Sequence, residues 1–181
     1  MSSSSNWPTP RREALRALGA LAALSLAAEQ APALDGHEGL PPLRAWGRGE
    51  FRRFGLLVYE AALWAGDDPT RPPLALALTY RRAIRGQALA EASVQEMRRL
   101  LPDDPRLPRW GEQLTALFPD VKPGDRITGL QLPSGARFTW NGRPLGAVDD
   151  PAFARAFFGI WLDARTSAPE LRAALLRGPG G

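Results

Sequence analysis

The feature that most constrains the fold of this chain is an aromatic amphipathic helix that begins after Asp149. Asp150 is a suitable N-cap for a helix starting at Pro151, because a proline at the first helical position sacrifices no hydrogen bond. Apolar residues then recur at helical spacing and form one broad face: Phe153, Phe157, Ile160 and Trp161. A short chain with so many large side chains on one helix needs an extensive partner surface, and predicted strands elsewhere supply it.

A second helix is predicted directly after the turn at Arg165 and Thr166. Ser167 and Glu170 have the spacing of a capping box, in which each side chain bonds the backbone of the other residue. Leu171, Leu175 and Leu176 follow on one face, and the helix is predicted to end near Gly178.

The strands are predicted from alternation and from turn residues. Residues 43–64 read as one extended segment, apolar on both sides beyond Gly55 and therefore covered on both faces. Residues 74–80 alternate as a second strand. A three-stranded meander is expected over 125–132, 137–140 and 143–148, in which Asn141-Gly142 predicts a type I′ turn and Pro144 marks the last strand as an edge.

Two further helices are predicted between these strands, over 87–101 and 105–118. The element order is then strands, two helices, a meander and two helices. This order predicts an α+β fold, an open-faced β-sandwich in which helices pack on one face of a large antiparallel sheet.

The composition excludes several kinds of chemistry. The 181 residues contain no Cys, and His37 is the only His. A thiolate nucleophile, a Cys-ligated zinc, a Ser-His-Asp triad and a multi-His metal site are therefore ruled out, and we expect neither a metal nor another cofactor. The net charge of +4 comes without a block of like charges or a basic–aromatic pattern, so we expect no nucleic-acid partner.

The first 33 residues have the order of an export signal. Arg11 and Arg12 precede an apolar run over 14–28, and Ala31-Pro-Ala33 offers the small residues that a signal peptidase reads. The arginine pair resembles a twin-arginine signal, and the run is too short for a stable membrane span. We predict an exported, periplasmic protein with its domain over 34–181; the alternative is a cytoplasmic protein that keeps an amphipathic N-terminal helix.

Several motifs, in order, resemble bacterial chalcone isomerase-like proteins over residues 43–177. They are Gly47-Arg-Gly49, Arg53-Phe-Gly55, Val58-Tyr-Glu-Ala61, Leu63-Trp64, the run from Phe118 to Asp125, Asn141-Gly142, and the run from Phe153 to Asp163. The resemblance implies the same open-faced β-sandwich that the element order predicts.

The resemblance also implies where catalytic groups would lie. Plant enzymes of this family close a chalcone ring with an Arg, a Thr, a Tyr, an Asn and a late Ser or Thr. By alignment, the early Arg matches Arg44, the Thr falls on Gly55, and the helical Tyr and Asn fall near Leu89 and Glu96. Because most of these polar groups are replaced, the resemblance implies a pocket without a catalytic residue.

Other proteins of this fold bind fatty acids, with an Arg and a Tyr on the carboxylate and an apolar slot for the chain. The candidate ligand-binding residues are Arg44, Arg53, Tyr59, Tyr80, Arg82, Thr166 and Ser167. Arg53 and Tyr59 share strand parity, as do Tyr80 and Arg82. The alternative is that both arginines extend to water from strand ends and both tyrosines belong to the core.

Three functions remain open at this point. The first is non-catalytic binding of a small hydrophobic or amphipathic molecule such as a fatty acid. The second is an isomerase acting on a conjugated or phenolic compound. The third is an envelope accessory protein that binds another protein.

Overall fold

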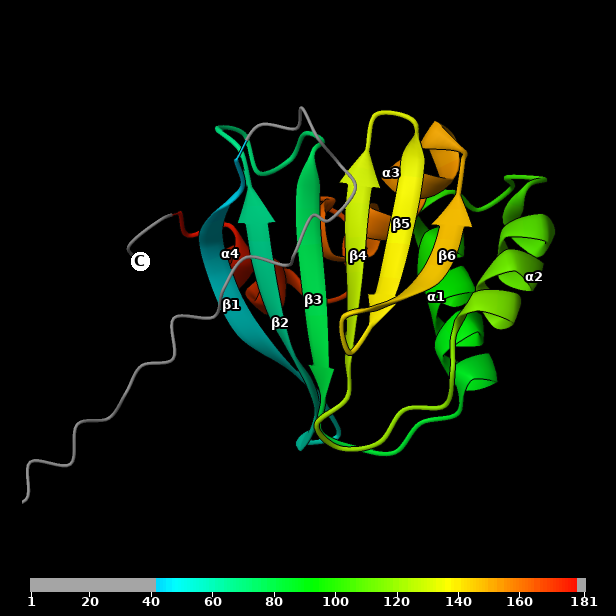
Figure 1. The fold of residues 1–181 in the computed structure, drawn as a ribbon, viewed down its shortest axis with the longest axis horizontal. Helices are drawn as coiled ribbons and strands as arrows, with labels where there is room; N and C mark the ends of the chain where they lie inside the picture. Colours follow the sequence, from blue (N-terminus) through cyan, green and yellow to red (C-terminus); the bar gives the residue numbers. More distant parts are fainter. Residues whose placement is uncertain (1–41, 179–181) are drawn as a thin grey trace, which may run out of the picture.

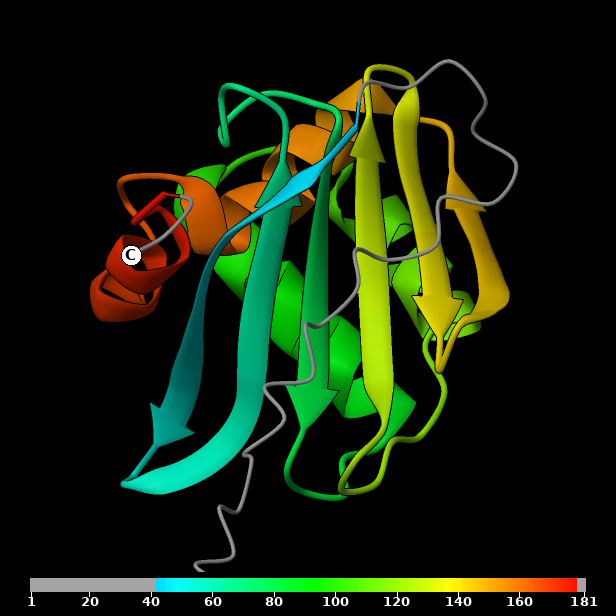
Figure 2. The ribbon, with the colours of Figure 1, turned by 60° about the vertical axis from the view of Figure 1, so that its left-hand side comes forward.

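The computed structural model describes residues 42–178, and the predicted export signal lies outside this range. Within it, six strands form one antiparallel sheet in the order β1 to β6, and four helices lie on one face of that sheet (Figure 1, Figure 2). The α+β open-faced β-sandwich is therefore confirmed. No helix in this part of the chain is long and apolar enough to cross a membrane.

The elements follow the predicted order, with the following bounds. The strands are β1 (Arg44–Arg53), β2 (Leu56–Ala65), β3 (Leu74–Tyr80), β4 (Arg126–Leu132), β5 (Gly135–Trp140) and β6 (Arg143–Val148). The helices are α1 (Gly86–Leu100), α2 (Leu107–Leu117), α3 (Pro151–Leu162) and α4 (Pro169–Leu175). The meander and its edge strand β6, which contains Pro144, are as predicted.

The prediction of one extended segment over 43–64 is wrong, because the chain reverses at Phe54 and Gly55. Both residues have positive φ, 51° and 76°, as a two-residue type I′ turn requires. The turn separates β1 from β2, which pair with each other along their length. Sequence alternation continues through the turn without a break, so the pattern concealed it.

A β-bulge lies close to this turn. Phe51 pairs with Tyr59 and Arg52 pairs with Leu57, which leaves Val58 as an extra residue on β2. A bulge re-aims side chains locally, and both Val58 and Tyr59 line the cavity described below.

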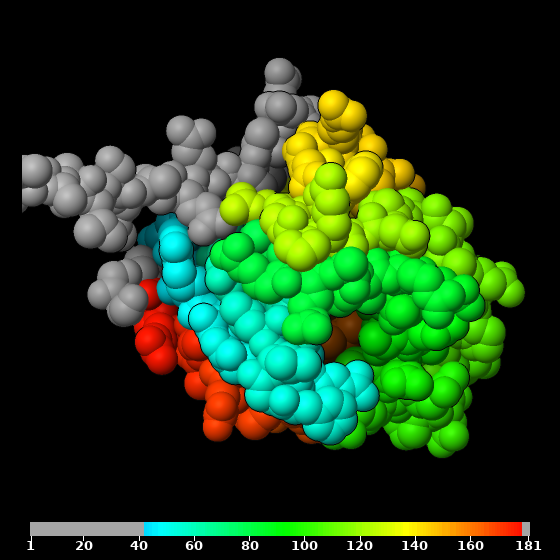
Figure 3. Space-filling view, turned by 90° about the horizontal axis from the view of Figure 1, so that it is seen from below, coloured from blue at the N-terminus to red at the C-terminus, as the bar shows by residue number. Residues whose placement is uncertain are grey.

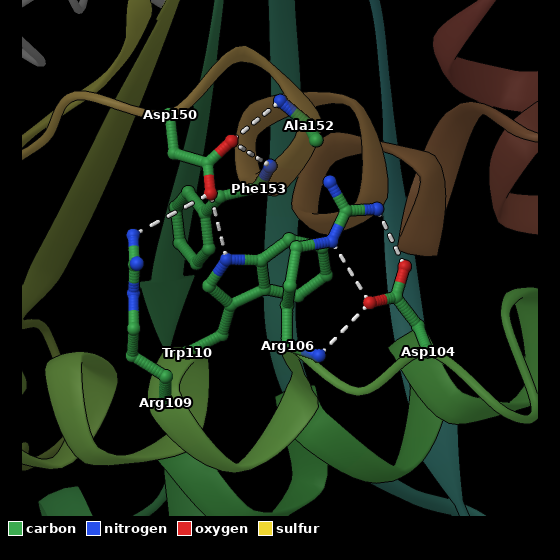
Figure 4. Close-up of polar contacts among 7 residues, drawn as sticks. All are labelled: Asp104, Arg106, Arg109, Trp110, Asp150, Ala152 and Phe153. Atoms are coloured by element: carbon green, nitrogen blue, oxygen red, sulfur yellow. Dashed lines mark hydrogen bonds and ion pairs between the residues drawn. The ribbon is translucent and has the colours of Figure 1, made fainter.

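The start of α3 is fixed by Asp150, as predicted. Its carboxylate accepts hydrogen bonds from the backbone N–H groups of Ala152 and Phe153, and the indole N–H of Trp110 donates to the same side chain at 3.0 Å (Figure 4). Burial works to raise the pKa of Asp150, but these hydrogen bonds together lower it below its ordinary value. One carboxylate thus caps α3 and anchors α2 to it.

Arginines surround the Trp110 ring at this junction (Figure 4). The Arg106 guanidinium lies 4.9 Å from the ring centroid and bonds both carboxylate oxygens of Asp104. Arg109 forms a longer ion pair with Asp150, at 3.8 Å. A continuous aromatic cluster extends from this junction into the core, and comprises Trp110, Phe118, Phe138, Phe153, Phe157, Phe158 and Trp161.

The capping box predicted for the last helix is wrong. Helix α4 begins at Pro169 with Ala168 as its N-cap, and no side chain caps it. The Ser167 hydroxyl instead donates to the Glu96 carboxylate at 2.7 Å, which ties the α3–α4 turn to α1. Tertiary contact with α1 therefore takes the hydroxyl that the local pattern assigned to the helix start.

Candidate binding cavity

A cavity of about 450 Å³ lies between α1 and the sheet. Figure 3 shows its mouth as a hollow between the β1–β2 hairpin, in cyan, and the green β3–α1 region. Residues of α3, in dark orange, form the floor of this hollow. The backbone of helix α1 lies close to α2 and α3 but scarcely approaches the backbone of the strands. The space exists because this helix stands away from the sheet.

Helix α1 is held at both ends. At its start the Gly86 N–H donates to Asp120 at 2.8 Å, and a Cβ at Gly86 would overlap the Phe118 carbonyl. At its end Leu100 packs against Gly159 of α3, where a Cβ would lie 3.2 Å from the leucine methyl. The two glycines permit these close approaches, and the middle of α1 spans the gap between them.

The inner surface of α1 explains why the gap is not filled. The residues of this helix that line the cavity are small or polar, apart from one leucine: Ala88, Leu89, Ala92, Ser93, Gln95 and Glu96. Its large buried side chains, Met97 and Leu100, belong to the other end of the helix. Small side chains cannot reach the sheet across the distance that the helix ends impose.

The opposite wall is apolar. It comprises Leu76, Leu78, Ile127 and Gly129 of the sheet, Phe118 and Phe138, and Phe157, Phe158, Ile160 and Trp161 of α3. Gly129 lets Phe158 approach the strand closely, since a Cβ there would lie 3.0 Å from its ring. Such a wall suits an aliphatic or aromatic guest.

Two tyrosines supply polar atoms at the wall formed by β2 and β3. Tyr59 accepts a hydrogen bond from the Trp161 indole at 3.0 Å and stacks on Phe51 with centroids 4.9 Å apart. Tyr80 contacts Tyr59 edge to face at 6.1 Å. Burial raises the pKa of both phenols, so both keep their protons at neutral pH and can donate hydrogen bonds to a guest.

A carboxylate and a guanidinium complete the polar groups. Glu96 lines the cavity from α1, accepts the Ser167 hydrogen bond and lies 3.6 Å from Arg99. Arg53 lines it from the end of β1 and is exposed, with its guanidinium 5.5 Å from the Phe54 ring centroid. The cation therefore lies on the solvent side, beside the hairpin turn.

Three of the seven predicted ligand-binding residues come together here: Arg53, Tyr59 and Tyr80. Arg53 and Tyr59 lie on different strands, so their proximity comes from the turn and the bulge, and the single-strand parity predicted for them is wrong. Arg82 is exposed beyond the end of β3 and is not part of the lining.

The remaining three candidates lie elsewhere. Arg44 forms an ion pair with Asp67 at 3.2 Å, outside the lining. The buried Thr166 hydroxyl donates to the Ile160 carbonyl at 2.5 Å and accepts from the Ala168 N–H, both backbone contacts. Ser167 reaches the cavity only through Glu96.

The sequence named Glu96 only through its alignment with the family's helical Asn, and it did not single out Ser93 or Gln95. A usable signal was present, because the inward positions of the first turns of α1 carry small and polar residues where a sheet-packed helix would carry large apolar ones. Such a face indicates a helix that does not rest on its sheet. Gly55, aligned with the family's Thr, lies in the exposed hairpin turn. A side chain at this position would contact nothing within 4 Å of its Cβ.

The residues that line the cavity provide contacts for an amphipathic molecule. Two protonated phenols, a carboxylate and an exposed guanidinium border one apolar space. Within residues 42–178 no group of three His, Cys, Asp or Glu side chains could hold a metal ion. The arrangement can orient an amphipathic molecule through hydrogen bonds while the apolar wall buries the rest of it.

Comparison with known proteins shows which family the chain resembles. A protein-family model described as chalcone isomerase-like matches residues 52–177. An uncharacterized protein of Haemophilus influenzae is 32% identical over 104 residues, which are 58% of this chain and 52% of that protein. The match thus spans about half the length of this curated relative.

Among solved structures, a fatty-acid binding protein of Arabidopsis thaliana superposes with a TM-score of 0.61 at 14% identity. The superposition covers 75% of this chain and 87% of the plant protein. At this identity the likeness shows a shared fold.

Proposed function

The chain belongs to the chalcone isomerase-like family, and we propose that it binds a small amphipathic molecule, such as a fatty acid, without converting it. The observation that carries this proposal is the 450 Å³ cavity left by the stand-off of α1, apolar on one wall and bordered by a few polar groups. Its volume falls within the range typical of small-molecule sites, about 300–1,000 Å³.

The cavity has an apolar wall on one side and a few polar groups near its mouth, an arrangement that suits a carboxylate with an aliphatic chain. Each CH₂ buried against the Leu76, Ile127 and Phe157 wall contributes about 0.8 kcal/mol. The carboxylate end pairs with the Arg53 guanidinium at the mouth and accepts hydrogen bonds from Tyr59 or Tyr80. The structural neighbour from Arabidopsis thaliana is itself a fatty-acid binding protein, which supports this choice of ligand.

Glu96 limits which molecules fit. Its carboxylate lies in the same lining as the tyrosines, so a ligand carboxylate placed beside it would meet a like charge. The ligand head is therefore expected on the Arg53 side of the cavity, and a ligand hydroxyl is the group that suits the Glu96 side. The site thereby favours a molecule with one acidic end over a dicarboxylate.

Titration of the delipidated full-length protein with palmitate tests the proposal, preceded by native mass spectrometry for a co-purified lipid. Arg53→Gln removes the charged partner and is expected to weaken binding by about 10- to 100-fold, the value of a charge-assisted hydrogen bond. Arg143→Gln is the matched control, because this arginine is exposed at the start of β6 and does not line the cavity.

A second pair of variants tests the location. Ala92→Trp places an indole at the mouth of the cavity, since Ala92 lines it and is exposed, and is expected to block binding, whereas Gln87→Trp, exposed on the same helix and outside the lining, leaves it unchanged. Equal affinity in both tryptophan variants contradicts the proposal. Cyclisation of a chalcone by the wild type, lost in Ala92→Trp, would identify an isomerase instead. Binding of an envelope protein with no small ligand would favour an accessory role.

We also propose that the chain is exported, on the order of basic, apolar and small residues in its first 33 positions. Cell fractionation with mass measurement of the mature protein tests this. A mass that matches cleavage after Ala33, in the periplasmic fraction, is expected; an uncleaved cytoplasmic protein would overturn it.

A further inference from the structure

The tip of the β1–β2 hairpin carries exposed apolar side chains. Phe54 is 91% exposed and Leu56 is 52% exposed, and they are the large hydrophobic residues that stand out to solvent within residues 42–178. Phe54 also holds a positive φ that a bulky residue rarely adopts. The chain therefore keeps a large apolar side chain where neither packing nor backbone preference favours one.

Basic residues surround the same end of the molecule. Arg82 and Arg85 flank Ile84, which lines the cavity, and neither forms an ion pair with any residue of 42–178. Ile84 bridges to Val121, which brings exposed Lys122 of the next loop beside them.

The neighbouring acids are already engaged. Glu50 and Glu60 pair with Arg52 and Arg81. Asp120 accepts the Gly86 N–H, and buried Asp125 accepts hydrogen bonds from Lys122 N–H and Asn141. Neutral donors leave the charges of Asp120 and Asp125 in place, but the basic residues of these segments outnumber the four acids, so the net charge at this end is positive. The basic residues are Arg52, Arg53, Arg81, Arg82, Arg85 and Lys122.

We propose that this end of the protein docks on an anionic lipid bilayer, with Phe54 and Leu56 inserted among the lipids and Arg82, Arg85 and Lys122 on the phosphates. An aromatic tip within a cationic surround combines the two contributions that hold peripheral proteins at such a surface, apolar burial and attraction to anionic headgroups. A protein–protein interface typically has a broad apolar centre, which a single protruding side chain does not provide.

The tip lies beside the cavity mouth, so docking would serve ligand transfer; this role rests on the proposed function. Arg53 and Val58, on either side of the tip, and Ile84, between the two arginines, all line the cavity. The hollow seen in Figure 3 opens between these same segments. Docking therefore presents the cavity mouth to the bilayer, so that an amphipathic ligand passes between lipid and protein without crossing water.

Co-sedimentation of the full-length chain with vesicles tests the proposal. Vesicles of equimolar phosphatidylcholine and phosphatidylglycerol are expected to bind the protein, and phosphatidylcholine vesicles to bind it weakly. Arg82→Gln with Arg85→Gln should lower partitioning to the anionic vesicles by about 25-fold, since each basic residue near such a surface contributes about fivefold. Phe54→Asn with Leu56→Thr should lower it by at least about tenfold.

The matched control is Arg98→Gln with Arg155→Gln, which removes the same charge from exposed positions outside the cavity lining. Palmitate binding in solution is measured for every variant, and retention of that binding shows an intact fold and an intact cavity. The docking proposal is overturned, even if palmitate binds, by either of two results. One is a wild-type protein that binds neither vesicle type, and the other is equal vesicle binding by the wild type and all variants. Loss of a crosslinked protein partner in the tip variant, without vesicle binding, would assign the tip to a protein instead.

Discussion

Two of the tight hairpin turns of this sheet share a backbone conformation and differ in their first residue and in their surroundings. Phe54-Gly55 and Asn141-Gly142 both place two successive residues at positive φ. Asparagine tolerates that conformation, while phenylalanine meets a steric cost of roughly 1–2 kcal/mol there. The same turn is thus made once with a residue suited to it and once with a residue that is not.

The surroundings of the two turns differ as well. Asn141 is bonded into the protein: its side-chain oxygen accepts the Arg126 N–H at 2.8 Å and its amide donates to Asp125 at 2.9 Å. The Phe54 turn projects into solvent, held by the β1–β2 pairing and by a hydrogen bond from Arg52 to the Gly55 carbonyl. One turn stabilises the fold, and the other presents an apolar side chain at the cavity mouth.

The largest effect is expected for Asn141→Ala. The variant loses the side-chain hydrogen bonds with Arg126 and Asp125 and keeps a Cβ at a positive φ that alanine does not favour, for a combined loss of about 2–3 kcal/mol in the free energy of unfolding. Urea unfolding measures it. Asn141→Gly loses the same hydrogen bonds but suits the positive φ, so its loss should be about 1 kcal/mol smaller; equal losses in both variants would show that the conformation contributes nothing.

Phe54→Asn should have a smaller effect of the opposite sign. It relieves the strained φ, and little burial is lost because the ring is 91% exposed, so the free energy of unfolding should rise by about 1 kcal/mol. The same urea experiment applies. Phe54→Ala is the control, since alanine keeps the steric cost and should give no gain. A destabilised Phe54→Asn would mean that the ring packs on the protein in solution.

The smallest effect concerns acid. Hydrogen bonds from Asn141, and then from the Lys122 N–H, lower the pKa of Asp125 below its unfolded value of about 3.9. A lowered folded-state pKa adds stability above about pH 4 that is lost as the pH falls through the folded value. The stability difference between wild type and Asn141→Ala should therefore narrow below about pH 4, while the Phe54→Asn difference stays constant. Unfolding curves at several pH values check this, and parallel pH profiles for all three proteins would contradict it.

The two turns also mark the limit of prediction from sequence. Asn-Gly between alternating segments predicted the β5–β6 hairpin correctly, because the residues themselves favour the turn. Phe-Gly within an extended pattern that continues on both sides gave no such signal, so residues 43–64 were predicted as one strand. That error placed Arg53 and Tyr59 on one strand, yet both line the cavity, because the turn places β1 and β2 side by side and the bulge at Val58 re-aims the neighbouring side chains.

Local residue chemistry determined the helices, the meander, the Asp150 cap and the antiparallel α+β layout, since each depends on neighbours a few residues apart. Only the tertiary structure decided the rest. Ser167 left its predicted capping box for Glu96, and α1, held at Gly86 and Leu100, stands off the sheet and leaves the cavity. A void depends on how far apart whole elements are held, and that distance is set by contacts between residues far apart in the sequence.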